Sequence, residues 1–258
     1  MSTPFVSIIV PVLHDAPELA RLLDALAAQG LSESGGGAAR WEVIVANGDG
    51  EDTGIAALRR RSTGVCWVTS DPGRGRQMNA GARLARGDWL LFLHADTCPE
   101  PGWQAELRRI ARDPGAVGGA LRFTLRSAAR RARLLERGVA WRVRWLGLPY
   151  GDQGIFVRRD VFEQVGGYRP LPLMEDVDLV RRVARRGRMA YPPAPIRVSP
   201  RRWERDGWVR RTAGNLLILA LYALGIAPER LARVYYGGSA RRAGRDASRP
   251  GAGVSCPG

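Results

Sequence analysis

Short apolar runs alternate with helical patterns along the first third of the chain. The runs at 6–12, 41–46 and 65–68 are rich in Val, Ile and Trp, which is typical of strands buried on both faces. Leucines at helical spacing follow Pro17, and a second helix is expected over 54–61. This alternation of strands and helices predicts a doubly wound, mostly parallel sheet.

The sharpest boundary follows the apolar run at 89–93. Polar and small residues succeed this expected strand up to Asp96, and Pro99 and Pro101 block its continuation. Ligands bind at the carboxyl ends of strands in open α/β sheets, so we expect Asp96 at the rim of a crevice. Its carboxylate suits Mg²⁺ or Mn²⁺ shared with a diphosphate. The alternative is that Asp96 caps a helix beginning near Pro101.

The second half has shorter and more varied elements. Strands are expected at 117–123 and after the turn at 150–154, helices at 127–145, 159–165 and 174–186, and extended pieces at 190–191 and 196–198. A helical region follows Arg201–Trp203. From about residue 237 the chain is rich in Gly, Ser, Arg and Pro, which predicts a disordered tail. We therefore expect an α/β domain over 1–200, a helical region over 201–236 and a tail over 237–258.

The most apolar stretch is Leu216–Ile226. Its 11 residues fall short of the roughly 20 that span a bilayer. We expect this segment to pack on the α/β domain. The alternative is an interfacial helix on a membrane surface, because arginines surround it.

Composition adds a strong positive charge. The chain has 40 basic residues, all of them Arg, and 25 acidic ones, giving a formal net charge of +15. Arginine binds phosphate bidentately, so a phosphorylated ligand, an anionic membrane and nucleic acid are all admissible partners. We expect solvated helix faces to hold much of this charge.

The cysteines and the N-terminus bear on location. Cys66, Cys98 and Cys256 are widely spaced and match neither a disulfide framework nor a zinc site. This favours a reducing cytoplasm. The apolar run at 6–13 lacks a basic lead and a cleavage site, so we expect no signal peptide.

Four polar clusters lie at the ends of the expected elements, at 47–52, 74–79, Asp96 and 175–178. In a parallel sheet the first three share one edge. A metal-binding carboxylate, arginines for phosphate and a further carboxylate for proton abstraction together suit transfer of a group from a diphosphate leaving group. Each cluster alone also has an ordinary explanation as a loop or a helix terminus.

Five sequence blocks in this order resemble glycosyltransferase family 2. They are GRGRQMNAGA at 73–82, LLFLHADT at 90–97, YGDQGIFVRR at 150–159, LMEDVDL at 173–179 and RRW at 201–203. The resemblance covers about 6–236. Within the family, the chain is more narrowly similar to the short bacterial transferases of the arsenosugar-biosynthesis-like, selenodomain-associated group. It implies the GT-A fold, with a Rossmann-like, mostly parallel sheet flanked by helices and with 1–200 as the catalytic domain.

The same resemblance implies the central chemistry. Asp96 would be the metal-binding aspartate of a DxD-like motif, with Mg²⁺ or Mn²⁺ as cofactor and His94 where the family often has a first aspartate. Asp176 would be the general base, with Glu175 as the weaker candidate.

The remaining implied contacts fall into two sets. The nucleotide would contact Pro11, Asp15, Asn47, Asp52, Arg76, Gln77, Asn79 and Ala95. The sugar, the acceptor or the leaving diphosphate would contact Gly151, Asp152, Gln153, Arg201, Arg202 and Trp203. Asn47 and Asp15 stand where the family usually has Asp and Glu.

The implied activity is inverting transfer of a sugar from a nucleoside-diphosphate sugar, with UDP as the expected carrier, to a small-molecule or lipid acceptor. We expect no nucleic-acid partner, a cytoplasmic location, and peripheral contact with the inner face of the cell membrane through 203–236 as an open possibility. One alternative is a sugar-phosphate nucleotidyltransferase, although 12–16 lacks the glycines of its phosphate loop. The other is a basic membrane- or RNA-binding protein, for which Trp141–Trp145 is the clearest interleaved cluster.

Overall fold

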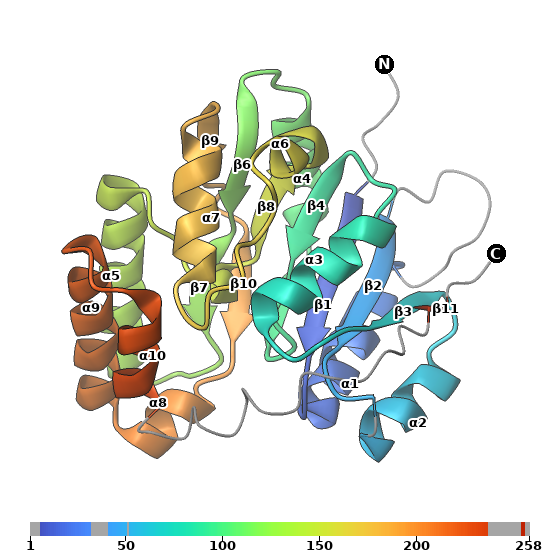
Figure 1. Cartoon of the computed structure of the whole chain (residues 1–258), viewed down its shortest axis with the longest axis horizontal. Helices are drawn as coiled ribbons and strands as arrows, with labels where there is room; N and C mark the ends of the chain where they lie inside the picture. The colour runs from blue at the N-terminus through green and yellow to red at the C-terminus, as the bar shows by residue number, and fades with distance from the viewer. Residues whose placement is uncertain (1–5, 32–40, 51, 237–253, 256–258) are drawn as a thin grey trace.

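A computed structural model describes residues 6–31, 41–50, 52–236 and 254–255, which form two sheets with helices around them (Figure 1). The large sheet has eight strands in the order β11-β3-β2-β1-β4-β8-β6-β9, and the small sheet has the order β5-β10-β7. The large sheet consists of β1 (Val6–Val12), β2 (Trp41–Asn47), β3 (Val65–Thr69), β4 (Trp89–Phe92), β6 (Ala116–Ala120), β8 (Ile155–Arg158), β9 (Arg188–Ala190) and β11 (Val254–Ser255). The small sheet consists of β5 (Thr97–Pro99), β7 (Arg122–Leu125) and β10 (Pro195–Val198).

The large sheet is mostly parallel. β1 pairs in parallel with β2 and β4, β2 pairs in parallel with β3, and β8 runs antiparallel to both β4 and β6. Every residue of β1 and β2 is buried, as their apolar composition predicts for strands covered on both faces. The predicted α/β class with a mostly parallel sheet is therefore confirmed.

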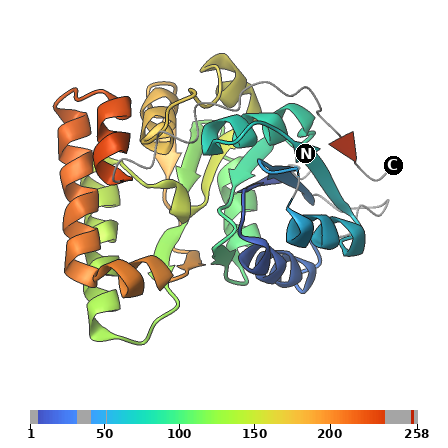
Figure 2. The ribbon, with the colours of Figure 1, turned by 60° about the horizontal axis from the view of Figure 1, so that its bottom comes forward.

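Helices cover both faces of this sheet (Figure 2). Ile8 and Val10 of β1 join a core with three helices, α1 (Ala16–Ala27), α2 (Thr53–Arg61) and α4 (Trp103–Ala111). Ile9 points to the other face and joins a core with α3 (Arg74–Leu84), α6 (Arg159–Gln164) and α7 (Glu175–Ala184). The two-residue alternation of side chains along one strand thus supplies both cores.

The remaining helices gather beside the small sheet at one end of the molecule (Figure 1). They are α5 (Arg130–Leu146), α8 (Arg201–Asp206), α9 (Trp208–Ala223) and α10 (Pro228–Tyr235). Ile218 and Leu219 of α9 are buried with Val177 of α7, so the apolar stretch packs on the α/β domain through one side only. Among the described residues, no helix combines the length and the hydropathy needed to cross a bilayer.

Several elements differ from the predictions. The polar cluster at 74–79, expected at the end of an element, lies inside a helix, because α3 already begins at Arg74. Thr97–Pro99, where no strand was expected, forms β5 at the edge of the small sheet. The strand expected at 117–123 divides at Leu121, whose N–H donates to the carbonyl oxygen of Gln153 at 2.9 Å, and its halves β6 and β7 enter different sheets. Asp96 caps no helix, since the N-cap of α4 is Gly102.

The C-terminal prediction was wrong at two residues. Val254 and Ser255 form β11, which pairs antiparallel with β3, although both lie in the expected disordered tail. The rest of that tail and the glycine-rich loop at 32–40 lie outside the described residues. Cys66 of β3 is disulfide-bonded, and the cysteine spacing did not predict this disulfide. Cys98 has a free thiol.

Two glycine substitutions test the packing of the sheet. A Cβ atom at Gly119 in β6 would overlap the carbonyl oxygen of Ala190 and the ring of Phe156, whereas a Cβ at Gly138 in α5 meets nothing within 4 Å. We expect Gly119→Ala to lower the free energy of unfolding by about 3 kcal/mol, because the strands cannot separate to make room. Gly138→Ala should raise it by about 0.5–1 kcal/mol, since alanine favours helix. Urea unfolding of both variants measures the difference, and equal midpoints would contradict the packing described here.

Candidate active site

The carboxyl ends of β1, β2 and β4 form one rim of the large sheet. Val12 pairs with Asn47 across β1 and β2, and Ile9 pairs with Phe92 across β1 and β4. The polar residues that follow these three strands therefore emerge side by side. This is the edge on which the sequence predicted a ligand site.

A cavity of about 90 Å³ opens at this rim, between the end of β4, the 3₁₀ turn η1 (Gly151–Gln153), α7 and the C-terminal helices. Three carboxylates line it, from Asp96, Asp152 and Asp176, together with the guanidinium groups of Arg74 and Arg202. His94, Gly151, Met174 and Trp203 also line the cavity. Asp96, the predicted metal ligand, and Asp176, the predicted general base, thus meet in one cavity, although they are 80 positions apart in sequence.

The carboxylate of Asp176 is held by two backbone groups at the start of α7. Its Oδ2 accepts the N–H of Gly151 at 2.6 Å, and its Oδ1 accepts the N–H of Val177 at 2.7 Å. A Cβ at position 151 would lie 2.7 Å from Nε2 of His94 and 3.3 Å from Oδ2 of Asp176. Glycine is therefore required where η1 approaches the carboxylate.

Backbone strain marks the residue that precedes this helix. Met174 has a φ of 66° and is the one non-glycine residue with positive φ within the described ranges. A side chain in the left-handed region costs about 1–3 kcal/mol and persists only when its surroundings impose it. The strain fixes the direction in which the chain enters α7, two residues before Asp176.

Glu175 is not among the residues that line the cavity, and it joins two helices. Its Oε1 accepts from Nε of Arg74 at 2.7 Å, while its buried Oε2 has no hydrogen-bond partner. Burial raises the pKa of Glu175, the positive charge of Arg74 lowers it, and Asp176 adds to the rise. The carboxylate in turn raises the pKa of Arg74. This pair ties the start of α3 to the start of α7, which leaves Asp176 as the carboxylate of the two that lines the cavity.

Two other titratable groups in the cavity are strongly perturbed. Burial raises the pKa of Asp152 to about 6; Arg142 opposes this, and the charges of Asp96 and Asp176 add to it. Oδ1 of Asp152 is buried without a hydrogen-bond partner. Burial and the nearby charges of Arg74 and Arg202 lower the pKa of His94 to about 3. His94 is therefore neutral at pH 7, and the Asp152 oxygen can accept from a sugar hydroxyl or coordinate a cation.

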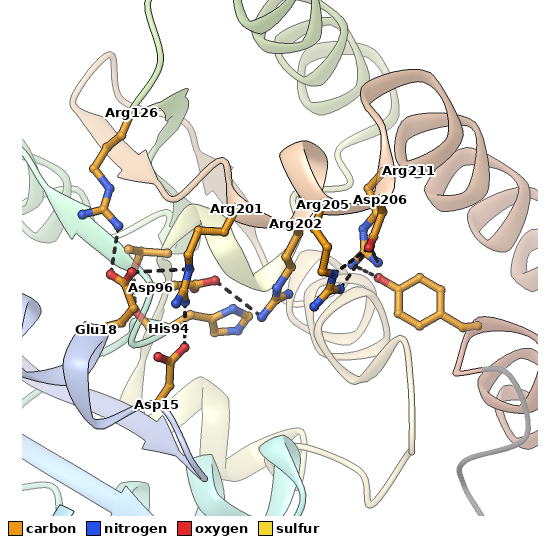
Figure 3. A network of polar contacts seen from close by, with 12 residues as sticks. Asp15, Glu18, His94, Asp96, Arg126, Arg201, Arg202, Arg205, Asp206 and Arg211 are labelled. Atoms are coloured by element: carbon orange, nitrogen blue, oxygen red, sulfur yellow. Dashed lines mark hydrogen bonds and ion pairs between the residues drawn. The ribbon is translucent and has the colours of Figure 1, made fainter. Parts of the chain in front are cut away.

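Helix α8 brings the late basic-aromatic motif to the rim (Figure 3). A guanidinium nitrogen of Arg202 lies 3.4 Å from Oδ2 of Asp96, and Arg201 donates to Oδ2 of Asp15 at 2.8 Å. Trp203 lines the cavity and packs edge-on against Phe123, with ring centroids 6.1 Å apart. The structure thus places all three predicted residues of this motif at or beside the site.

Glu18 is a member of this network that the sequence analysis missed. Its buried carboxylate accepts from Arg21 at 2.6 Å and from Arg126 at 3.0 Å, and it lies 3.4 Å from Arg201 (Figure 3). Burial would raise the pKa of Glu18, but the hydrogen bonds from Arg126 and Arg21 and the charge of Arg201 lower it overall. Its position one turn before Leu22, on the apolar face of α1, was the available sign that this carboxylate is buried.

Two predicted nucleotide contacts are used by the fold itself. Nε2 of Gln77 donates to the carbonyl oxygens of Val12 and Ala46 at 2.5 and 2.9 Å, which joins α3 to the ends of β1 and β2. The side chain of Asn47 closes a turn with the backbone of Asp49. A nucleotide would have to compete with these bonds.

Further predicted contacts, Asn79, Gln153, Pro11, Ala95 and Arg76, also lie outside the cavity lining. The amide of Asn79 bonds in both directions to the backbone of Tyr168, at 2.7 and 2.9 Å. Gln153 is buried and accepts from Arg142 and from the N–H of Tyr150, both at 3.2 Å. Pro11 and Ala95 are buried at the strand ends, and half-exposed Arg76 lies 4.0 Å from Asp71. Their roles toward the nucleotide or the acceptor stay predictions.

A second group on the rim could hold a metal ion. One ligand atom from each of His14, Asp49 and Asp52 lies within 4.8 Å of the others, and Nδ1 of His14 is 3.1 Å from Oδ2 of Asp49. Oδ1 of Asp52 also caps α2 by accepting the N–H of Ile55 at 2.8 Å. The sequence analysis placed Asp52 near the nucleotide but did not predict this trio.

The family model described as glycosyl transferase family 2 matches residues 7–170, well over half of the chain. This chain belongs to glycosyl transferase family 2. The matched segment contains Asp96 and Asp152 and ends before Asp176. The family that the sequence blocks indicated is confirmed.

Two curated relatives match over part of their length. Glycosyltransferase AglE of Haloferax volcanii is 26% identical over 185 residues, which is 64% of this chain and 56% of AglE. The PGL/p-HBAD biosynthesis glycosyltransferase of Mycobacterium bovis BCG is 35% identical over 101 residues, 37% of each chain. This family member therefore spans about half or less of the relatives that it matches.

Solved structures of other glycosyltransferases share the fold. The mannosyltransferase PcManGT from Pyrobaculum calidifontis, in complex with GDP-Man and Mn²⁺, is 20% identical with a TM-score of 0.62, covering 92% of this chain and 69% of its own. TarS 1–349 of S. aureus, in complex with UDP-GlcNAc, is 14% identical with a TM-score of 0.55, covering 76% of this chain and 58% of its own. These similarities confirm the GT-A fold.

The raised pKa of Asp152 predicts a pH effect on stability. The folded chain keeps this proton up to about pH 6, whereas an unfolded aspartate releases it near pH 4. Between these values the folded state binds more protons, so the free energy of unfolding falls as the pH rises. Asp152→Asn removes this titration. The free energy of unfolding of the variant minus that of wild type should therefore rise by about 2–3 kcal/mol from pH 4 to pH 7.5.

Urea unfolding at the two pH values measures this gain. The matched control is Asp88→Asn, which makes the same substitution at an exposed carboxylate outside the cavity, and the gain of Asp152→Asn should exceed that of this control. An equal response of the two variants would show that Asp152 titrates as an exposed aspartate.

Proposed function

We propose that this chain transfers a sugar from a nucleoside-diphosphate sugar to a small-molecule or lipid acceptor, with inversion at the anomeric carbon. The observation that carries the proposal is the meeting of Asp176, oriented by two backbone N–H groups, with Asp96, Arg74 and Arg202 in one cavity. The complexes of PcManGT with GDP-Man and of TarS with UDP-GlcNAc support a donor of this class. We keep UDP as the proposed carrier and test GDP against it.

The proposed reaction is a single in-line displacement. Asp176 takes the proton of the acceptor hydroxyl while the oxygen of that hydroxyl attacks C1 of the sugar. The bond from C1 to the diphosphate oxygen breaks, and its electron pair leaves with the nucleoside diphosphate. Arg202 and Arg74 line the cavity and stabilise the charge that grows on the leaving group. Glu175 is the weaker base, because its carboxylate is buried against Arg74.

The cavity volume limits what this pocket holds. About 90 Å³ is well below the roughly 300–1,000 Å³ of pockets that enclose a whole drug-sized ligand. We infer that the cavity takes the sugar and the acceptor group. The nucleotide then extends along the rim toward Asp15, Asn47 and Asp52, where the strand ends offer polar groups.

A divalent cation suits the oxygen donors of the cavity. Mg²⁺ and Mn²⁺ prefer carboxylate oxygens, and the unpartnered Oδ1 of Asp152 together with the carboxylate of Asp96 provides them. We propose that these two residues hold the ion, with the trio of His14, Asp49 and Asp52 as the competing site. When bound, a divalent ion supplies Lewis-acid stabilisation of a leaving diphosphate.

The first test separates the two adjacent carboxylates. Asp176→Asn should reduce donor-sugar turnover by about 10²–10⁴-fold, as expected for loss of a general base, while nucleotide affinity stays within about threefold. Glu175→Gln should lower the melting temperature, because the partly buried Arg74 loses its charged partner, yet retain more turnover than Asp176→Asn. Release of nucleoside diphosphate and calorimetric titration measure the two effects. Near-normal turnover of Asp176→Asn would show that Asp176 is not the general base.

The second test identifies the nucleotide and the metal-binding residues. Ligands that bind the folded state raise the melting temperature, so UDP-, GDP- and dTDP-sugars are compared with and without Mn²⁺. At about 100 times its Kd the correct donor should raise the midpoint by about 5–10 °C. Asp96→Asn should lose the Mn²⁺-dependent part of this shift, whereas His14→Gln should keep it. The opposite result would assign the ion to the trio.

A further inference from the structure

The outer ridge of α5 is apolar. Leu134, Trp141 and Trp145 are 66%, 60% and 67% exposed, although leucine and tryptophan are usually buried in globular proteins. Their spacing of seven and four residues places them on one line along the helix, opposite the buried Ala132 and Val139. This ridge therefore contributes nothing to the core on which α5 packs.

Helix α9 has a similar outer side. Val209, Leu216 and Leu217 are each more than half exposed, and Leu224 follows directly after the helix with 79% exposure. Its inner side already fills a core through Ile218 and Leu219. From Leu216 to its end the helix is thus apolar on both sides, which in a globular protein is typical of a segment that is covered on both sides.

The two apolar sides belong to neighbouring helices. Figures 1 and 2 both show α5 and α9 next to each other at one end of the molecule. The guanidinium group of Arg131 on α5 stacks on the ring of Trp208 on α9, 4.8 Å from its centroid. We call Leu134, Trp141 and Trp145 of α5 and Val209, Leu216, Leu217 and Leu224 at α9 the outer helical face.

The charge beside this face is positive. Arg137 and Arg144 are exposed next to the tryptophans, and neither has a carboxylate partner among the side chains that the structure describes. The one acidic residue of α5, Glu136, turns inward and accepts the N–H of Leu125. α9 contains no acidic residue. The face therefore combines exposed tryptophan and leucine with uncompensated arginine.

We propose that the outer helical face docks on the surface of an anionic phospholipid bilayer. Tryptophan prefers the boundary between headgroups and acyl chains, leucine enters the acyl region, and arginine pairs with anionic headgroups. A second copy of the chain is a poorer occupant, because it would place the same arginines opposite one another. The proposed surface includes α5, which lies before the segment 203–236 expected from the sequence. It is independent of the proposed transfer reaction.

Vesicle flotation of the full chain tests the proposal. The chain should float with vesicles containing 30% phosphatidylglycerol in phosphatidylcholine and remain at the bottom with phosphatidylcholine alone. Trp141→Ser with Trp145→Ser should weaken binding at least tenfold. Arg137→Gln with Arg144→Gln should weaken it about 25-fold, since each arginine near an anionic surface contributes about fivefold.

The matched control removes the same charge elsewhere. Arg59→Gln with Arg60→Gln changes two exposed arginines on α2, beyond the opposite half of the sheet (Figure 1), and should alter binding less than twofold. Equal loss in both arginine variants would overturn the proposal, because binding would then follow net charge alone. Absence of vesicle binding would also overturn it. If sedimentation velocity then shows a dimer that the tryptophan variant abolishes, the face is an interface between copies.

Discussion

A strand that is buried on both faces can present polar side chains only where it ends, and this constraint organises the molecule. β1, β2 and β4 run in parallel through the centre of the large sheet, so their polar ends meet on one rim. The cavity with Asp96, Asp152 and Asp176 lies at that rim, and Asp96 enters it from the segment that follows β4. The short antiparallel β8 returns the chain from η1, which places Asp152 opposite the end of β4.

Buried charge is the second organising element. Glu175 and Glu18 are both buried, and each is stabilised by arginines from distant segments. Removing one partner from such a pair leaves an uncompensated charge in a low-dielectric interior. These pairs therefore hold α3 to α7, and α1 to α8, in the arrangement that frames the cavity. They also give part of the high arginine content a structural role.

The arginine-rich composition thus has more than one explanation. Arg74, Arg126 and Arg201 serve ion pairs around the site, and Arg142 supports η1 through Gln153. Arg137 and Arg144 form no ion pair with the carboxylates that the structure describes, and Arg144 lies over the ring of Trp145. Composition alone could not separate these groups, because an arginine is assigned to the interior, the rim or the outer surface only by the packing of its helix.

The sequence by itself determined the central strands β1 to β4, the helices between them and the polar residues at their ends, because local periodicity and composition control these features. It also pointed to Asp96 and Asp176 through short motifs. Only the tertiary structure decided that Gln77 bonds to the ends of two strands, that Glu18 collects arginines from three segments, and that β6 and β7 separate into two sheets. Each of these depends on which distant segment lies beside a residue. The same reason applies to α9, whose apolar residues look alike in sequence until packing on α7 buries one side and exposes the other.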